Sequence, residues 1–105
     1  MTTTHTFFPS LVETINAIPE SSIVSRTILK EDHFKAIVFA FAPGQELSQH
    51  TASVPAVIQI LEGECALTIG EAAYEGKPGT WAYMEAGVPH SLLANTPVKM
   101  LLLMM

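Results

Sequence analysis

Residues 44–63 read GQELSQHTASVPAVIQILEG, and residues 79–95 read GTWAYMEAGVPHSLLAN. Each stretch begins at a glycine, carries a single histidine (His50 or His90) and contains an apolar run of strand length. Short apolar runs bounded by glycine and proline are typical of the strands of β-sandwiches and β-barrels. The two stretches therefore indicate an all-β fold. Because His50 and His90 are far apart in the chain, only folding brings them together.

The rest of the chain repeats this alternation of apolar runs and turn signals, without an internal repeat or a low-complexity tract. We expect Gly63, between Glu62 and Glu64, to lie in the turn of a hairpin, because a two-residue hairpin turn favours a residue that tolerates positive φ. The pattern predicts strands at residues 23–29, 34–41, 56–61, 65–69, 80–84, 91–94 and 99–104.

A chain of 105 residues has the size of one domain. We divide it into an N-terminal segment, residues 1–22, and a barrel, residues 23–105. Within the first part, Ser10 and Glu13 have the spacing of a capping box and favour a short helix. An irregular segment lying over the barrel is the alternative.

The composition argues against several classes of partner. Ten acidic and five basic residues give a net charge of −5, with no basic cluster for nucleic acid or an anionic membrane. The longest apolar runs are far shorter than the ~20 residues of a membrane span. The single cysteine, Cys65, cannot form an intrachain disulfide, and it is expected to be a small buried residue. With no secretory signal pattern at the N-terminus, we expect a cytoplasmic protein.

The two opening stretches resemble the paired motifs of a small, single-domain cupin of the RmlC-like family. The first motif has a glycine, five residues, His-x-His, a carboxylate and a closing glycine, and Gly44 and Gly63 fall in register with it. Gly79 and Gly87 match the glycines of the second. The resemblance implies a cupin-type double-stranded β-helix, which is a jelly-roll barrel whose mouth holds a metal ion or a small ligand.

The resemblance also implies a ligand set that this sequence has partly lost. His50 and His90 match the first and third histidine ligands, whereas Ala52 stands at the second histidine and Ala56 at the carboxylate. A tightly held divalent ion usually takes at least three protein side chains. Binding of a divalent metal ion by His50 and His90 alone is therefore expected to be weak. Glu85 stands at the position of the proline of the second motif.

Other polar and aromatic residues are weaker candidates. Gln59 is an odd number of residues from Ala56, and side chains alternate between the two faces of a strand. It should therefore point to the outside of the barrel. Glu85 is the one carboxylate that we would test for acid–base chemistry. Trp81 and Tyr83 could line a ligand pocket, but packing in the core is the commoner outcome for aromatic residues on a strand.

These observations favour a small-molecule-binding cupin barrel of undetermined ligand, expected to act as a homodimer because sheet edges and the apolar residues 100–105 need cover. The ligand should be small and largely apolar, with one anionic or acceptor group for the imidazoles. One alternative is a metal-dependent enzyme of the dioxygenase or isomerase type that uses the two histidines. A second alternative is a structural or regulatory dimeric scaffold. The expected ligand-binding residues are His50, Ala52, Ala56, Ile58 and His90.

Overall fold

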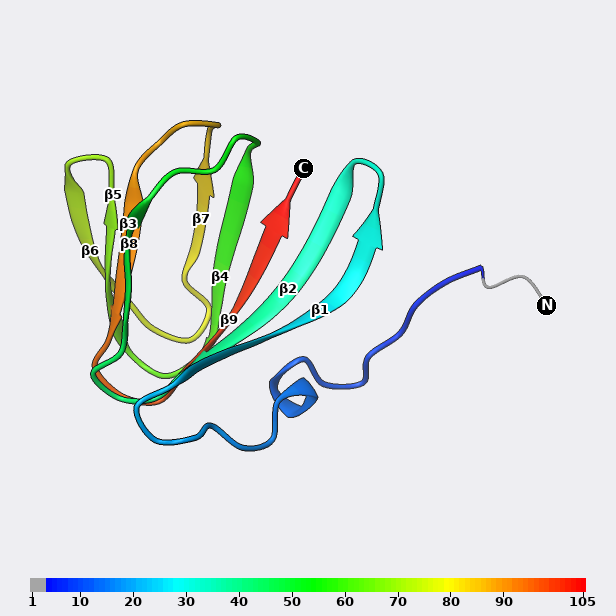
Figure 1. Cartoon of the computed structure of the whole chain (residues 1–105), viewed down its shortest axis with the longest axis horizontal. Helices are drawn as coiled ribbons and strands as arrows, with labels where there is room; N and C mark the ends of the chain where they lie inside the picture. The colour runs from blue at the N-terminus through cyan, green and yellow to red at the C-terminus, as the bar shows by residue number, and fades with distance from the viewer. Residues whose placement is uncertain (1–3) are drawn as a thin grey trace.

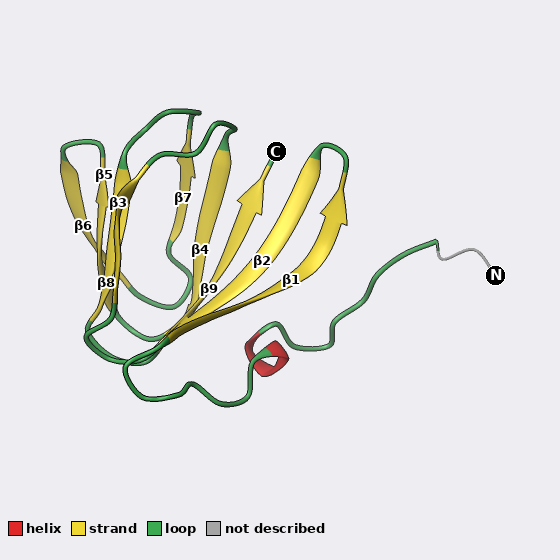
Figure 2. Cartoon of the chain, in the orientation of Figure 1, coloured by secondary structure: helices red, strands yellow, loops and turns green. Residues whose placement is uncertain are grey.

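The computed structural model describes residues 4–105 and consists of β-strands with one short helical turn, so the all-β expectation is confirmed (Figures 1 and 2). Residues 1–3 of the expected N-terminal segment lie outside the described residues. The strands are β1 (Ile23–Glu31), β2 (Phe34–Phe41), β3 (Glu46–His50), β4 (Ala56–Glu62), β5 (Cys65–Ile69), β6 (Ala72–Gly76), β7 (Trp81–Met84), β8 (His90–Ala94) and β9 (Val98–Met104).

The strands form two antiparallel sheets that face one another. The first sheet has the order β1-β2-β9-β4-β7, and the second has the order β3-β8-β5-β6. From β3 onward the chain crosses repeatedly between the sheets, which is the connectivity of a jelly roll. In Figure 1 the sheets converge at one end and spread apart at the other. We call the spread end the mouth; β3, β7 and β9 end there, and β4 and β8 begin there.

The core lies between the two sheets and follows the alternation expected for β4. Ala56, Ile58 and Ile60 are at most 2% exposed and belong to the main apolar cluster. Gln59 is half-buried and lies on the other face, as its parity predicts. The other members of the cluster are Phe41, Cys65, Leu67, Met84, Leu92, Ala94, Val98 and Met100.

The N-terminal segment packs on the outer face of the first sheet and is mostly irregular. Its helical part is one 3-10 turn, Val12–Thr14. The Nζ of Lys99 donates to the carbonyl oxygen of Val12 at 2.8 Å, and Nη1 of Arg26 donates to that of Thr14 at 3.2 Å. An isolated helix this short is marginal, so contacts with the sheet decide its conformation. No helix in the described part of the chain has the length and hydropathy needed to cross a membrane.

Two strands, β3 and β6, were not predicted from the sequence. Their sequences are ELSQH and AAYEG, and most of their residues are exposed. Both lie at the edges of the second sheet, where one side of the strand has no neighbour within the sheet. Because no apolar run marks such an edge strand, the alternation of hydrophobic residues does not reveal it.

The expectation that Gly63 closes a hairpin is wrong. Gly63 links β4 in the first sheet to β5 in the second, so the chain here changes layers. Its φ is +89°, and a Cβ at this position would overlap the carbonyl oxygen of Pro97. The glycine therefore allows both a left-handed conformation and a close approach of two backbone segments.

The expected burial of the β7 aromatics is also wrong. Trp81 is 61% exposed and Tyr83 is 51% exposed, because both lie on the outer face of the first sheet, opposite Gln59 and Val57. Both edges of β9 are paired, since this strand lies between β2 and β4, and its outward residues Leu101 and Leu103 are half-buried.

Candidate functional site

His50 and His90 meet at the mouth of the barrel. They are opposite each other on the paired strands β3 and β8, and their ring centroids are 4.2 Å apart with an interplanar angle of 62°. His90 is 5% exposed, whereas His50 lies at the exposed rim. The expected approach of the two imidazoles is therefore present, with one ring buried and the other accessible.

A β-bulge in β3 creates this contact. Leu47 pairs with Leu92 and His50 pairs with His90, so three steps along β3 correspond to two steps along β8. The extra residue lies at Ser48 or Gln49. Because side chains alternate between faces, a regular strand would place Gln49 opposite His90 and direct His50 away from it. The bulge therefore brings His50 to the face of the barrel that carries His90.

Backbone carbonyl groups orient both imidazoles in the same way. The Nδ1 of His50 lies 2.9 Å from the carbonyl oxygen of Ser48, and that of His90 lies 3.0 Å from the carbonyl oxygen of Val88. A carbonyl oxygen only accepts, so each Nδ1 carries the hydrogen, and in the neutral ring Nε2 then holds a lone pair. Both Nε2 atoms are suited to a metal ion or, when protonated, to an anionic ligand.

The two alanines occupy different parts of the mouth. Ala56 begins β4 and is 2% exposed. Ala52 lies in the connection after β3 and is not part of the strand that carries His50. The carbonyl oxygen of Ala52 accepts a hydrogen bond of 2.8 Å from the amide of Gly87. This bond ties the β3–β4 connection to the β7–β8 connection that delivers His90.

The four-ligand set implied by the cupin resemblance does not fit these residues. Within residues 4–105, no three His, Cys, Asp or Glu side chains gather at a common point. Glu85 is exposed at the start of the β7–β8 connection and adds no third donor to the histidine pair. Gln59 lies on the opposite face of β4 from Ala56. A pair of imidazoles is what remains of that set.

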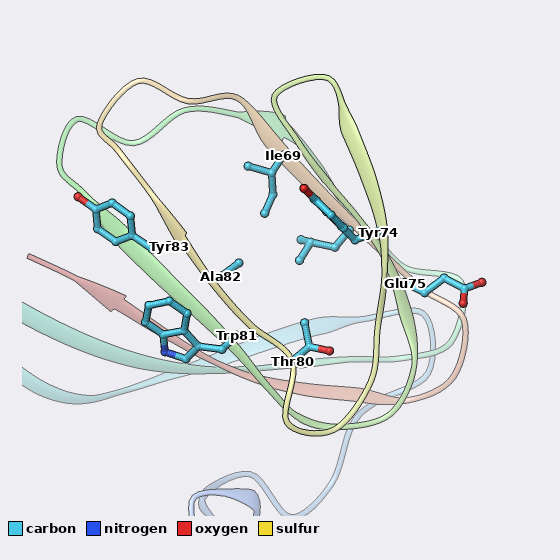
Figure 3. A pocket seen from close by; sticks show the side chains of 8 residues that line it. Ile69, Tyr74, Glu75, Thr80, Trp81, Ala82 and Tyr83 are labelled. Atoms are coloured by element: carbon cyan, nitrogen blue, oxygen red, sulfur yellow. The ribbon is translucent and has the colours of Figure 1, made fainter.

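A hollow of about 420 Å³ lies between the edge strands β6 and β7. Figure 3 shows Ile69, Ala82 and Tyr74 between these strands. Trp81 and Tyr83 extend from the other side of β7 and also line the hollow. Ile69 pairs directly with His90 across β5 and β8, so one wall of the hollow adjoins the histidine pair. Leu67, Glu75 and Thr80 also line this hollow.

Most residues of this hollow were not predicted from the sequence. Tyr74 lies on the unpredicted strand β6, and Ile69 and Ala82 look like ordinary strand residues. The hollow arises because β6 and β7 do not pair, and pairing across sheets is not visible in the pattern of either strand.

A second hollow of about 410 Å³ lies on the other flank of the mouth. Lys35, Val54 and Met104 line it, together with the β1–β2 turn. His50 and His90 line neither hollow. Ala52 and Ala56 also line neither hollow, and Ala56 pairs with Met84 on one side and with Met104 on the other.

Cys65 behaves as the sequence analysis expects of a buried residue. It is 1% exposed, and burial raises the pKa of its thiol above the ordinary value of 9.0, with a hydrogen bond from the backbone of Gly76 acting in the other direction. The thiol is thus held in the neutral, unreactive form and belongs to the core.

Comparisons with known proteins agree with this architecture. The family model of the cupin domain matches residues 37–105. A conserved protein from Streptococcus pyogenes superimposes with a TM-score of 0.84 at 30% identity, covering 96% of this chain and 88% of that one. A cupin superfamily protein from Desulfitobacterium hafniense gives a TM-score of 0.84 at 23% identity, over 90% of this chain and 86% of that one. A search of curated proteins gives no match.

A cupin 2 conserved barrel domain protein from Leptotrichia buccalis gives a TM-score of 0.83 at 26% identity. The match covers 90% of this chain and 46% of that one. The family model thus matches well over half of the chain. The same chain has jelly-roll connectivity and pairs His50 with His90 across β3 and β8. The chain belongs to the cupin family.

Proposed function

We propose that this protein binds a small, largely apolar molecule with one anionic or acceptor group at the mouth of its barrel. The observation that carries the proposal is the pair of imidazoles in contact, each with Nδ1 bound to a carbonyl group and Nε2 left for a ligand. Two imidazoles fixed in this way present two neighbouring polar atoms, and small-molecule sites use a few such polar groups to orient a ligand.

The hollow between β6 and β7 suits the apolar part of such a ligand. Its volume of about 420 Å³ falls within the usual range for small-molecule sites. Leu67, Ile69 and Ala82 supply apolar surface, and the position of Ile69 beside His90 connects the hollow to the polar end of the site. The ligand would thus lie with its apolar body between the sheets and its polar group at the imidazoles.

Titration calorimetry with benzoate, hexanoate and cyclohexanecarboxylate tests this function, with benzyl alcohol as a neutral analogue. At least one carboxylate should bind saturably and more tightly than the alcohol. Replacing both His50 and His90 by alanine should weaken that binding at least about tenfold, since a hydrogen bond to a charged group contributes about 1.5–3 kcal/mol.

Two further variants locate the ligand. Ala82→Phe should reduce binding by filling the hollow, whereas His33→Ala, which removes an exposed histidine on the β1–β2 turn, should leave it unchanged. The proposal is wrong if none of the three carboxylates binds, or if the double histidine variant binds them as well as the parent protein does.

A further inference from the structure

The inner face of the first sheet carries a pair of lysines at the mouth, where β1 ends and β2 begins (Figure 1). Lys30 of β1 is directly opposite Lys35 of β2, and Lys35 in turn pairs with Met104 of β9. Lys35 is an even number of residues from Phe41, which belongs to the main apolar cluster. Both lysine side chains therefore leave the sheet on the face that looks into the barrel.

The placement of two lysines opposite each other costs free energy. Residues paired across antiparallel strands have Cβ atoms about 4.5–5.5 Å apart, and like charges at this spacing are destabilising. The chain has only five Lys and Arg residues and a net charge of −5, so an excess of basic residues does not account for the pair. Lys35 is also half-buried, and its neighbours on the same face, Met104 and Ile37, are apolar. An anion between the two amino groups would replace this repulsion by attraction.

The two lysines line the second hollow, which has a volume of about 410 Å³. Met104 and Val54, the latter from the β3–β4 connection, supply apolar surface to it. A volume of this size lies within the usual range for small-molecule sites. The hollow therefore has room for an anionic group at the lysines together with an apolar body.

Two carboxylates also line this hollow, but neither belongs to the lysine pair. Glu31 directly follows Lys30, so its side chain leaves β1 on the opposite face, where it lines another hollow with residues 4–6. Asp32 lies in the turn between β1 and β2. Both carboxylates are exposed, so water and salt screen their charge more than that of the half-buried Lys35. The remaining lining residues are His33, Phe34, Ser53 and Met105.

A phosphate monoester matches two lysines better than a carboxylate does. It carries a charge of about −1.5 to −2 at pH 7 and three acceptor oxygens, so it can meet two ammonium groups at once. Lysine is a common phosphate ligand, in which the ammonium group acts as a point charge. A carboxylate has a single negative charge and two oxygens.

We propose that the second hollow binds a small phosphate monoester with an apolar body, and that its phosphate group lies between the amino groups of Lys30 and Lys35. The apolar body contacts Val54 and Met104. This site goes beyond the proposed carboxylate site and rests on other residues, because His50 and His90 do not line the hollow.

Titration calorimetry of the full chain with phenyl phosphate tests the proposal, with inorganic phosphate and phenol as partial probes. Phenyl phosphate should bind saturably, with one molecule per chain, and more tightly than either partial probe. Added NaCl should weaken this binding. Lys35→Gln should weaken it at least about tenfold, because a hydrogen bond between charged groups is lost at a half-buried position. Lys30→Gln, at an exposed position, should weaken it about two- to fivefold.

The control is Lys77→Gln, which removes the same charge from an exposed lysine on the β6–β7 connection, beside a different hollow. It should bind phenyl phosphate as the parent does. Urea unfolding checks that all three variants fold, and loss of the like-charge pair should leave the Lys30 and Lys35 variants at least as stable as the parent. Equal losses of binding in all three variants would indicate attraction to the charge of the whole chain and overturn the proposal.

The double variant His50→Ala, His90→Ala separates this site from the proposed carboxylate site. It should bind phenyl phosphate as tightly as the parent protein does. Loss of binding in the histidine variant, with binding retained in Lys35→Gln, would assign the phosphate to the imidazoles and overturn the proposal. Absence of saturable phenyl phosphate binding to the parent protein would overturn it as well. That second result leaves the carboxylate function intact, because the titrations with benzoate and its analogues measure it separately.

Discussion

The imidazole rings of His50 and His90 lie edge to face, with centroids 4.2 Å apart, because β3 contains one more residue than the stretch of β8 that it pairs with. A bulge of this kind redirects a single side chain without changing the rest of the sheet. The geometry of the site thus depends on the length of β3 as much as on the presence of the two histidines.

Deletion of both Ser48 and Gln49 should place His50 directly after Leu47, opposite Ser91, and so turn it to the opposite face. Nuclear Overhauser contacts between the two imidazole rings should then disappear, and binding at the mouth should be lost with them. Gln49→Ala keeps the length of the strand and should retain the ring contact, so this substitution is the matched control. Loss of the contact in both variants, or in neither, would contradict the register of β3 against β8.

Restoration of the missing family ligands should create a site for divalent metal ions. The double substitution Ala52→His and Ala56→Glu adds an imidazole and a carboxylate to His50 and His90, which completes the four-ligand set that the cupin resemblance implies. Affinity for Zn²⁺ measured by calorimetry should rise by orders of magnitude relative to the parent. Each single substitution should give a smaller gain. An unchanged affinity in the double variant would indicate that position 52 does not reach the histidines.

Gly63→Ala should be strongly destabilising, because the new Cβ would overlap the carbonyl oxygen of Pro97 in a backbone with positive φ. Gly79→Ala is the control, since φ is +94° there but the space around it is open. The control should cost only the backbone strain of about 1–3 kcal/mol. Urea unfolding should show the larger loss at Gly63, and equal losses would mean that the close approach to Pro97 is unimportant.

Cys65 should make the stability of the fold depend on pH in the alkaline range. Burial raises the pKa of the folded thiol above the ordinary value of 9.0, so the unfolded chain ionises first as pH rises. The free energy of unfolding should therefore fall as pH increases through about 9.0. Cys65→Ala should show a smaller fall between neutral and alkaline pH in urea titrations. An identical decline in parent and variant would assign the effect to other groups.

We propose that the outer face of the first sheet forms the contact of a homodimer. Trp81 and Tyr83 are exposed there and pair with Gln59 and Val57 of β4, which in turn adjoin Leu101 and Leu103 of β9. Exposed aromatic residues beside apolar ones are typical of protein contacts, and a twofold arrangement would bury the same patch on both subunits.

Sedimentation at micromolar concentration should give a dimer for the parent and a monomer for the double variant Trp81→Lys, Tyr83→Lys. Tyr74→Lys replaces an aromatic residue of similar exposure on β6, in the other sheet, and should leave the dimer intact. A monomeric parent protein would contradict the proposed contact.

The sequence alone determined the fold class, the position of most strands and the loss of two family ligands. Ala56, Ile58 and Ile60 were correctly assigned to the interior because alternation along a strand is a local property, with a period of two residues. The two histidines were identified through the resemblance to the cupin motifs, in which they match the first and third histidines.

The tertiary structure decided which strands are neighbours and in what register. It placed His50 opposite His90 through a bulge, set Met84 and Met104 beside Ala56, and turned Trp81 outward. Strand pairing joins residues that are distant in the chain, and one inserted residue reverses the face of every side chain that follows. A pattern of hydrophobic residues records which side chains alternate, but it does not record which strand lies alongside or where an extra residue is accommodated.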